Sequence, residues 1–409
     1  MKKAFLILIF LAAIGSTIHA GGFQVALQGQ RQAGMGLLGT GFLTGPSIVY
    51  YNPGGMSFLQ DNFSLSLGVS PIVSNVAFQY EAPSLYETTT DNPTSLPFTL
   101  YSAGKINDKL ALGLGVYTPF GSTTIWGDDW RGRYIIQDIS LLSVFIQPTV
   151  SYKITNSLGI GVGFIYAYGD VTMHKGIPLE DQSGEEGQAT IEGSTSNYGF
   201  NAGLYFTPSD KLSIGATYRS KITMEMNEGN ASFDVPEALA ASFPDTKFKT
   251  ELPLPASVNI GISYHMNEKL SLGADFNYVF WEEYESLDFD FETNTDALQD
   301  IVQPKNYSNG AIYRIGLQYK VSEKLNARTG FYYDSPVVGD DYYAPETPDA
   351  VKLGFTGGIS YSPSSKLSID LSYLQIIGLE RTASYMPENF GGTYKYNAFI
   401  PGVGVNYKF

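Results

Sequence analysis

The sequence predicts an all-β protein: a transmembrane antiparallel β-barrel of fourteen strands with an N-terminal hatch, or plug, inside its lumen. Three observations lead to this prediction. A short turn motif recurs along the chain, the segments that leave each turn alternate apolar and polar residues, and long polar segments separate the resulting hairpins. Bacterial outer-membrane barrels combine short periplasmic turns, long external loops and an even number of strands.

The composition excludes several other classes of protein. Only 16% of the 409 residues are charged, against roughly 25% in soluble proteins. No apolar run approaches the roughly 20 residues that a membrane-spanning helix needs. The absence of cysteine excludes disulfides, zinc–thiolate sites and thiol catalysis. A net charge of −15 also argues against nucleic acid as a partner.

The N-terminus is expected to be a secretion signal. Lys2 and Lys3 precede an apolar stretch at 4–14, and cleavage is expected after Ala20. The predicted organisation is a signal peptide at 1–20, a hatch at 21–60 and the barrel at 61–409.

The turn motif consists of two small polar or acidic residues followed by Lys-Leu, as in Asn107-Asp108-Lys109-Leu110. Such a motif between alternating segments predicts a tight hairpin. It recurs before Leu212, Leu270, Leu325 and Leu367, with a variant that lacks lysine at Asn156-Ser157-Leu158.

The segment after Lys366 illustrates the alternation. Leu367, Ile369 and Leu371 share one face, and the residues between them are polar. In a membrane barrel the apolar face contacts lipid and the polar face lines the lumen.

Long polar segments are expected as loops between the hairpins. Seven such loops and six short turns give fourteen strands, with both chain termini on the short-turn side. The loops are acidic, which suits solvated external loops, and divalent-cation bridging to lipopolysaccharide is the alternative role. The predicted loops are 81–96, 121–138, 174–196, 227–252, 287–309, 335–350 and 378–393.

Residues 21–60 lack the strand alternation and are rich in glycine and other small residues. A fourteen-stranded barrel is wide enough to need filling, since barrel diameter grows with strand number. We therefore expect this segment to plug the lumen. Asn52-Pro53 is expected to form a fixed turn, because the asparagine side chain forms hydrogen bonds with nearby backbone groups and the proline ring fixes the backbone angle φ.

Several spaced motifs resemble those of the FadL-like outer-membrane transporters of long-chain fatty acids and aromatic hydrocarbons. Gly22-Phe23-Gln24 is similar to the family's mature N-terminus, and Asn52-Pro53-Gly54-Gly55 to its hatch motif. The other matching motifs include Thr118-Pro119-Phe120-Gly121, Gly132-Arg133-Tyr134, Leu252-Pro253-Leu254-Pro255, Trp281, Tyr313-Arg314-Ile315-Gly316 and the run from Arg328 to Val337.

The resemblance implies a location, a function and a set of partners. The protein is expected in the outer membrane of a Gram-negative bacterium, as a monomer contacting lipid and lipopolysaccharide. Its alternating C-terminal strand, ending in Phe409, resembles the signal of outer-membrane barrels, whose partner is the barrel-assembly machinery. The expected function is uptake of hydrophobic small molecules, either fatty acids or toluene-like aromatic hydrocarbons.

The resemblance also implies a route. The ligand leaves an external groove, enters a pocket near Phe23 and Phe120, and is released sideways at the third strand after the hatch, with Asn52, Pro53 and Gly54, moves. Proline cannot donate to a sheet ladder, so Pro119-Phe120-Gly121 marks either a gap in the wall or simply a strand end.

Two departures from the family pattern bear on this route. Gly54 stands where the family has alanine, which predicts a looser hatch turn. One wall of the external groove, 174–196, is hydrophilic, whereas the other, 227–252, contains a short helical pattern from Pro236 to Phe243.

Alternation predicts which charges face the lumen. Because Ile315 and Thr329 face lipid, Arg314 and Arg328 face inward, as Arg219 does. A fatty-acid carboxylate needs a cationic partner, and arginine offers a two-pronged one.

Arg314 and Arg328 are therefore expected to meet the ligand's head group. The alternative is a structural network that joins them to Asp275, Asp370 or the hatch.

Two other classes of function stay open: a structural or adhesin barrel, and an outer-membrane hydrolase. Only His174 and His265 follow the signal peptide, and neither has a recognisable catalytic partner pattern. We expect no enzyme activity, no catalytic residue, no metal site and no cofactor.

Overall fold

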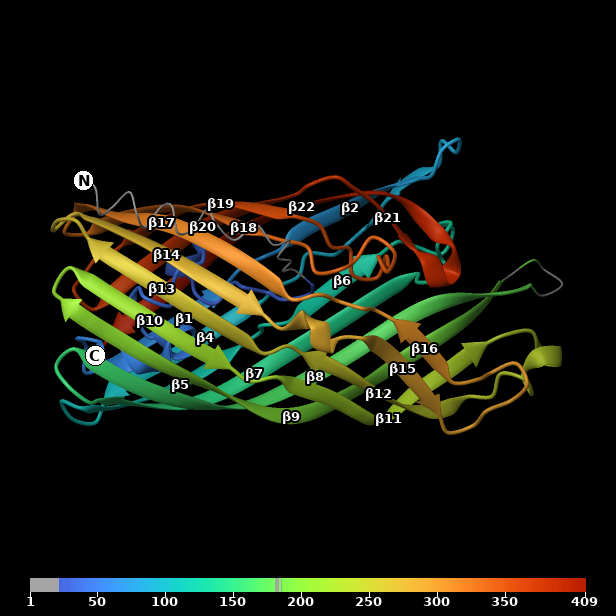
Figure 1. Ribbon diagram of the computed structural model, residues 1–409, viewed down its shortest axis with the longest axis horizontal. Helices are drawn as coiled ribbons and strands as arrows, with labels where there is room; N and C mark the ends of the chain where they lie inside the picture. Colours follow the sequence, from blue (N-terminus) through green and yellow to red (C-terminus); the bar gives the residue numbers. More distant parts are fainter. Residues whose placement is uncertain (1–21, 181–183, 185) are drawn as a thin grey trace.

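The computed structural model describes residues 22–180, 184 and 186–409. The predicted signal peptide and residues 181–183 and 185 of the acidic loop lie outside this part. The strands form one antiparallel barrel, closed where β1 (Phe63–Val69) pairs with β22 (Phe390–Lys408) (Figure 1). Eight of the 22 strand segments continue a neighbouring segment across a bulge or short break, so the wall has the predicted fourteen strands.

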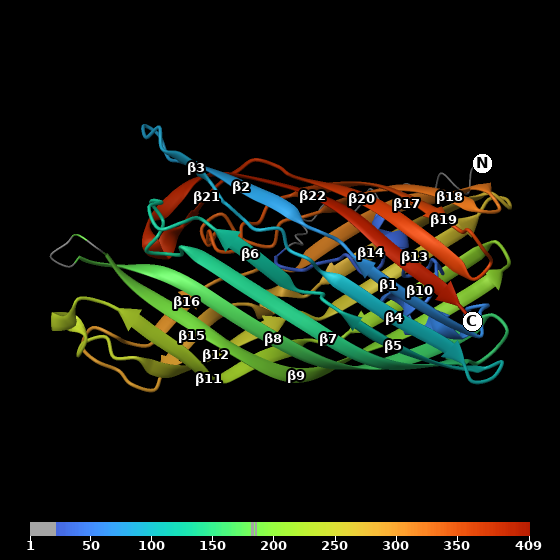
Figure 2. The same ribbon diagram turned by 180° about the vertical axis from the view of Figure 1, so that it is seen from behind.

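The wall strands follow one another in chain order, as Figures 1 and 2 show. They are β1 with β2 (Val73–Tyr80); β3 (Glu87–Thr89) with β4 (Phe98–Lys105); β5 (Leu110–Tyr117) with β6 (Gly121–Ile125); β7 (Asp138–Lys153); β8 (Leu158–Glu180); β9 (Glu186–Ser209); β10 (Leu212–Arg219) with β11 (Ile222–Asp234); β12 (Thr246–Leu254) with β13 (Ser257–His265); β14 (Leu270–Val279) with β15 (Ser286–Phe291); β16 (Ile301–Pro304) with β17 (Gly310–Ser322); β18 (Leu325–Asp334); β19 (Lys352–Tyr361); β20 (Leu367–Gly378) with β21 (Arg381–Tyr385); and β22. The 3₁₀ turns between strands are η2 (Glu237–Leu239), η3 (Trp281–Glu283) and η4 (Met386–Glu388).

The two faces of the wall differ as alternation requires. On β20, Leu371 is 53% exposed on the outside, whereas Asp370 is 1% exposed inside the barrel. Near the short turns, a row of tyrosines is exposed on the outer face, which fits an aromatic girdle at a membrane interface. The row includes Tyr152, Tyr264, Tyr319, Tyr361 and Tyr407. Within the described residues, no helix combines the length and apolar character needed to cross a membrane.

All six predicted short turns lie at one end of the barrel, but strands extend into several of the predicted loops, including 378–393, which contains β21. The segment 174–196 belongs mostly to β8 and β9, which pair as far as Glu180 and Glu186. Likewise, β11 and β12 continue into 227–252, and β15 pairs with β16 inside 287–309. Their polar outer faces are solvated beyond the membrane, so composition suggested loops where backbone pairing persists.

The segment 22–60 runs inside the barrel near the short-turn end, as the blue ribbon in Figure 1 shows. It contains α2 (Gln30–Ala33), α3 (Ile48–Tyr51) and η1 (Pro53–Phe58). We call it the inner segment. Its backbone touches the wall where the wall presents glycine. A Cβ on Gly330 would lie 2.3 Å from the Gly36 nitrogen, and one on Gly203 would lie 3.1 Å from the Pro53 backbone nitrogen.

Asn52 forms a defined turn before η1. Its side chain accepts a hydrogen bond from the Gly54 backbone at 3.0 Å and donates to the Thr40 and Leu204 carbonyls, both at 2.9 Å. The predicted looseness at Gly54 is wrong, because a Cβ there would meet the Gly203 carbonyl oxygen at 2.7 Å. Glycine lets this turn lie directly against β9.

The two ends of the barrel are expected to face opposite sides of the membrane. Because the native chain has no cysteine, any labelling by a thiol reagent comes from the single cysteine that is introduced. Leu85→Cys, at a position 91% exposed near a long-loop tip, is expected to react with a membrane-impermeant maleimide on intact cells. Asp210→Cys, in a short turn, is expected to react only after the cells are lysed. Labelling of Asp210→Cys on intact cells would reverse the topology.

Candidate functional site

The centre of the lumen is an aromatic junction around Phe23. Its ring lies 5.1 Å from that of Trp281, 6.0 Å from that of Phe120 and 6.4 Å from that of Tyr284. Phe23 and Phe120 are buried at 6% and 3% exposure. Segments far apart in sequence therefore meet at the start of the inner segment.

An apolar cavity of about 100 Å³ opens on the long-loop side of this junction. Its wall comes from β7, β8, β9, β11, β12, β15 and β16. Its polar exceptions include Glu346, which pairs with the buried Lys305. The apolar lining includes Ile139, Val171, Met173, Ile191, Met224, Met226, Phe248, Leu252 and Phe289.

The apolar cavity corrects two expectations about the external groove. The segment 174–196 is not hydrophilic on both faces, since Ile191 packs inward in a cluster with Met226 and Phe248. The helical pattern after Pro236 is only the single 3₁₀ turn η2, with Pro236 at its N-cap.

A second cavity, of about 460 Å³, lies on the other side of Phe23 and reaches the outer surface of the wall. We call it the side cavity. It is lined on the outside by Leu96 and Leu142, which are 62% and 46% exposed. On the inside it is lined by Arg314, Asp334 and Lys352.

The side cavity coincides with a break in the wall at Pro119. The β4–β5 ladder ends at the pair Thr99–Tyr117. In the described part of the chain β6 forms a ladder only with β7, and on its other side the Ile125 carbonyl at its far end accepts from the Asp91 backbone at 2.9 Å. The inner segment supplies the missing partners: Val25 donates to the Pro119 carbonyl at 2.8 Å, and Gly121 donates to the Phe23 carbonyl at 3.1 Å.

The two cavities adjoin at the aromatic junction. Phe23 and Phe120 line both of them, as do Leu141, Leu142 and Thr347. The path from one to the other therefore passes these side chains.

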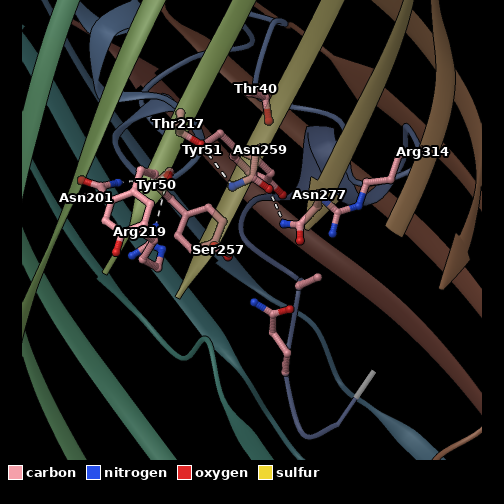
Figure 3. A pocket seen from close by; sticks show the side chains of 13 residues that line it. Thr40, Tyr50, Tyr51, Asn201, Thr217, Arg219, Ser257, Asn259, Asn277 and Arg314 are labelled. Atoms are coloured by element: carbon pink, nitrogen blue, oxygen red, sulfur yellow. Dashed lines mark hydrogen bonds between the residues drawn. The ribbon is translucent and has the colours of Figure 1, made fainter. Parts of the chain in front are cut away.

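A polar niche, shown in Figure 3, adjoins the side cavity at Gln24, Ala26 and Arg314. Its volume is about 20 Å³, room for about one water molecule. Asn259 donates to Thr217 at 3.1 Å and accepts from Asn277, so a row of polar side chains crosses neighbouring strands.

The two arginines at the niche are held differently. Arg219 donates to the Tyr117 hydroxyl at 2.9 Å and to the Tyr50 carbonyl at 3.2 Å, and its guanidinium lies 4.5 Å from the Tyr50 ring centre. Arg314 makes no side-chain hydrogen bond to any described residue, and its Nε is buried without a partner. Arg314 is therefore the arginine available to a ligand.

Arg314 and Arg328 both point inward but do not share a site. Arg328 donates to Gln318 at 2.7 Å and to Ser360, and it lines a separate cavity at the short-turn end. The pairing β17–β18 sets Arg328 opposite Gln318 and Arg314 opposite Tyr332. Arg328 therefore belongs to a structural network, as the alternative interpretation held. Arg314 instead lines the side cavity.

Two charged residues of the side cavity escaped the sequence analysis. Lys352 lies with its Nζ 3.4 Å from Asp349 and 3.5 Å from the Gly22 carbonyl. Asp334, its cross-strand neighbour, has a buried Oδ1 without a partner. The same alternation that selects Arg314 also selects both, since Phe331 and Phe355 on their strands face outward.

Comparison with known proteins identifies the chain. Residues 11–409 match the family described as "Outer membrane protein transport protein (OMPP1/FadL/TodX)". The chain belongs to this family. The resemblance seen in the sequence motifs is thereby confirmed, as is location in the outer membrane. The family is one of transport proteins rather than of enzymes, and the described residues hold no cluster of metal-ligating side chains.

Relatives and solved structures agree over nearly the whole chain. The 47 kDa outer membrane protein of Pasteurella multocida is 24% identical, covering 98% of this chain and 96% of the relative. The long-chain fatty acid transport protein of Escherichia coli is 22% identical, covering 98% of this chain and 97% of the relative. The fold matches that of a Pseudomonas aeruginosa FadL homologue with a TM-score of 0.82, 19% identity and coverage of 96% and 100%. The fold also matches that of the Pseudomonas putida toluene transporter TodX, with a TM-score of 0.74 and 17% identity, covering 93% of this chain and 98% of TodX.

In this FadL/TodX-family barrel, inward-facing acids hold the inner segment. Asp275 accepts hydrogen bonds from the Gly39 and Thr40 backbone, both at 2.9 Å. Asp370 accepts from Arg31 at 2.9 Å. Each acid therefore ties a different part of the segment to the wall.

Replacing Asp275 is expected to loosen the inner segment locally. In Asp275→Ala, two buried N–H groups lose their acceptor, at about 1–3 kcal/mol for each. Hydrogen exchange measured by mass spectrometry is expected to accelerate around residues 36–44. Asp334→Asn is the control, because Asp334 is also a buried acid but makes no hydrogen bond to the inner segment in the described structure. Unchanged exchange in Asp275→Ala would show that glycine packing alone holds this stretch.

An ion pair outside the membrane fastens the long-loop segment 126–137. Arg133 donates twice to Glu186, at 2.6 and 2.7 Å, and Tyr134 donates to the same carboxylate. Hydrogen bonds from Arg133 and then Tyr134 lower the pKa of Glu186 from 4.5 to about 2. The segment also packs inward through Trp126, which donates to the Pro345 carbonyl at 3.0 Å.

This fastening is expected to resist mild acid. Because the pKa of Glu186 is lowered by folding, the contribution is complete above about 4.5 and is lost only as the pH falls toward 2. Hydrogen exchange of 126–137, corrected for the intrinsic pH dependence, should stay constant from pH 8 to about 5. Glu186→Gln should accelerate it throughout that range. Equal protection in both proteins would show that the tryptophan packing suffices.

Proposed function

We propose that this barrel takes up hydrophobic small molecules, most specifically long-chain fatty acids, and releases them sideways into the membrane. The observation that carries the proposal is the adjoining pair of cavities: the apolar cavity and the side cavity meet at Phe23 and Phe120. A structural barrel or adhesin has no use for such a path.

The apolar cavity supports capture of the hydrocarbon tail. Each CH₂ group removed from water contributes about 0.8 kcal/mol, so the tail dominates affinity. The methionines Met224 and Met226 adapt their shape readily to different chains. Capture therefore needs no energy source in the barrel itself.

Release is proposed to follow movement of the inner segment as a hatch. Phe23 stands between the cavities. At the wall break its carbonyl accepts a hydrogen bond from Gly121, and the Val25 N–H donates to the Pro119 carbonyl. When this stretch withdraws, the ligand passes Pro119, Phe120 and Gly121 into lipid. A sideways exit spares an apolar tail from crossing water.

The head group is proposed to meet Arg314, with Lys352 nearby, and not Arg328. Arg314 has a buried donor without a partner, whereas Arg328 is bonded to Gln318 and Ser360.

Aromatic hydrocarbons are the second candidate ligand. The apolar cavity favours them, because dry apolar cavities of roughly 150 Å³ bind benzene, and its own volume is about 100 Å³. Such ligands have no head group and would not depend on Arg314.

The remaining partners are also proposals. Pairing of β1 with β22 closes the sheet into a barrel, which suits a monomer. The exposed apolar outer face suits membrane lipid, and Phe409, 64% exposed at the end of the last strand, suits recognition by the barrel-assembly machinery. The acidic external segments suit cation-bridged lipopolysaccharide.

Uptake in a host without its own transporter of this kind tests the proposal. The wild type should accumulate labelled oleate above the empty vector. Ser122→Glu, which places a charge in the side cavity, should reduce uptake about tenfold, because a hydrocarbon chain that passes this position has to displace the water that solvates the carboxylate. Binding of an uncharged hydrocarbon in the apolar cavity should persist in the purified variant, because Ser122 does not line that cavity.

Thr329→Glu is the matched control, since it places the same charge on the lipid-facing side of β18, away from the cavity. Accumulation of toluene but not oleate would select the aromatic candidate. Full uptake by Ser122→Glu would exclude the sideways exit.

A further inference from the structure

We infer that the side cavity selects ligands whose polar end both accepts and donates a hydrogen bond while uncharged: a protonated carboxylic acid, an alcohol, a phenol or a primary amide. The inference rests on the proposed function and names its substrate class. It starts from two buried polar atoms that lack partners, the Arg314 Nε and the Asp334 Oδ1.

These two atoms belong to one site. Asp334 stands opposite Ile312 in the β17–β18 ladder, so Arg314, two residues farther along the same inner face, is its diagonal neighbour at about 7–8 Å between Cα atoms. Both residues line the side cavity. One offers a donor and the other an acceptor, on either side of a space that a small polar group can occupy.

The neighbouring charges do not satisfy either atom. The Asp275 carboxylate, directly across from Arg314 on β14, accepts from the Gly39 and Thr40 backbone. Lys352, across from Asp334 on β19, donates to Asp349 and the Gly22 carbonyl.

The charge balance at this point disfavours an anion. Two cations, Arg314 and Lys352, face three carboxylates, Asp275, Asp334 and Asp349. A carboxylate ligand would add a fourth like charge in a desolvated site, which favours its protonated form. An uncharged O–H group instead donates to Asp334 and accepts from Arg314.

The same chemistry suits a sideways exit. An ionised head group is costly to move into hydrocarbon, whereas a neutral acid or alcohol is not. Selection for the neutral form at the side cavity thus prepares the ligand for lipid, because a fatty-acid carboxylate takes up a proton from water before it binds and enters the lipid uncharged.

Competition binding in lipid nanodiscs tests the inference, with a fluorescent fatty-acid probe and values corrected for partition into protein-free nanodiscs. The three non-ionisable ligands are decanol, methyl decanoate and decane, of which decanol alone both donates and accepts a hydrogen bond. Decanol should displace the probe about tenfold better than the ester, as expected for a hydrogen bond to a charged group. Decanoate should compete better at pH 5 than at pH 8.

Three variants isolate the acceptor. Asp334→Ala should reduce the preference for decanol over methyl decanoate to about twofold or less and leave decane unchanged. Asp334→Asn, which keeps an oxygen acceptor and the side-chain shape, should retain most of it. Arg328→Gln, an arginine removed outside the side cavity, should behave as wild type.

Equal displacement by decanol and the ester, or full preference in Asp334→Ala, would overturn the inference while leaving hydrophobic uptake intact. Failure of all three ligands, decane included, would instead overturn the proposed function.

Discussion

Backbone N–H and C=O groups that face lipid have no water to bond, so a membrane barrel must pair all of them internally. This constraint governs the structure, and Pro119 is where the wall alone does not meet it. Proline interrupts the third wall strand, β6 leaves its neighbour on one side, and the inner segment pairs there through Phe23 and Val25. The segment that occupies the lumen is thus also part of the wall.

That double role couples the barrel's integrity to its cavities. The carbonyl that accepts from Gly121 belongs to Phe23, whose side chain separates the apolar cavity from the side cavity. Displacing the ring therefore disturbs the wall's bonds at the same place. Farther along, glycines such as Gly330 and Gly203 allow the inner segment to rest directly on the wall, and Asp275 and Asp370 hold it there.

Polarity changes in steps across the lumen. The apolar cavity presents aliphatic and aromatic side chains, the side cavity adds Arg314, Asp334 and Lys352, and the niche beyond is lined almost entirely by polar groups. An amphipathic molecule fits such a series in one orientation, with its tail toward the extended hairpins. Arg328, which the same alternation places inside, lies instead in the polar network at the short-turn end.

The sequence by itself determined the strand count, the turns and the inward faces, because a period of two and short turn motifs are local properties. It therefore indicated Arg314 correctly as inward-facing, and the same rule applied to β18 and β19 would have added Asp334 and Lys352. Tertiary structure decided what these residues meet. Whether Arg314 lacks a partner while Arg328 has two depends on the stagger of neighbouring strands, and the tight fit of Gly54 depends on a backbone some 150 residues away in β9. The reach of β8 and β9 beyond the membrane was likewise decided by cross-strand pairing, since a solvated strand and a loop share the same polar composition.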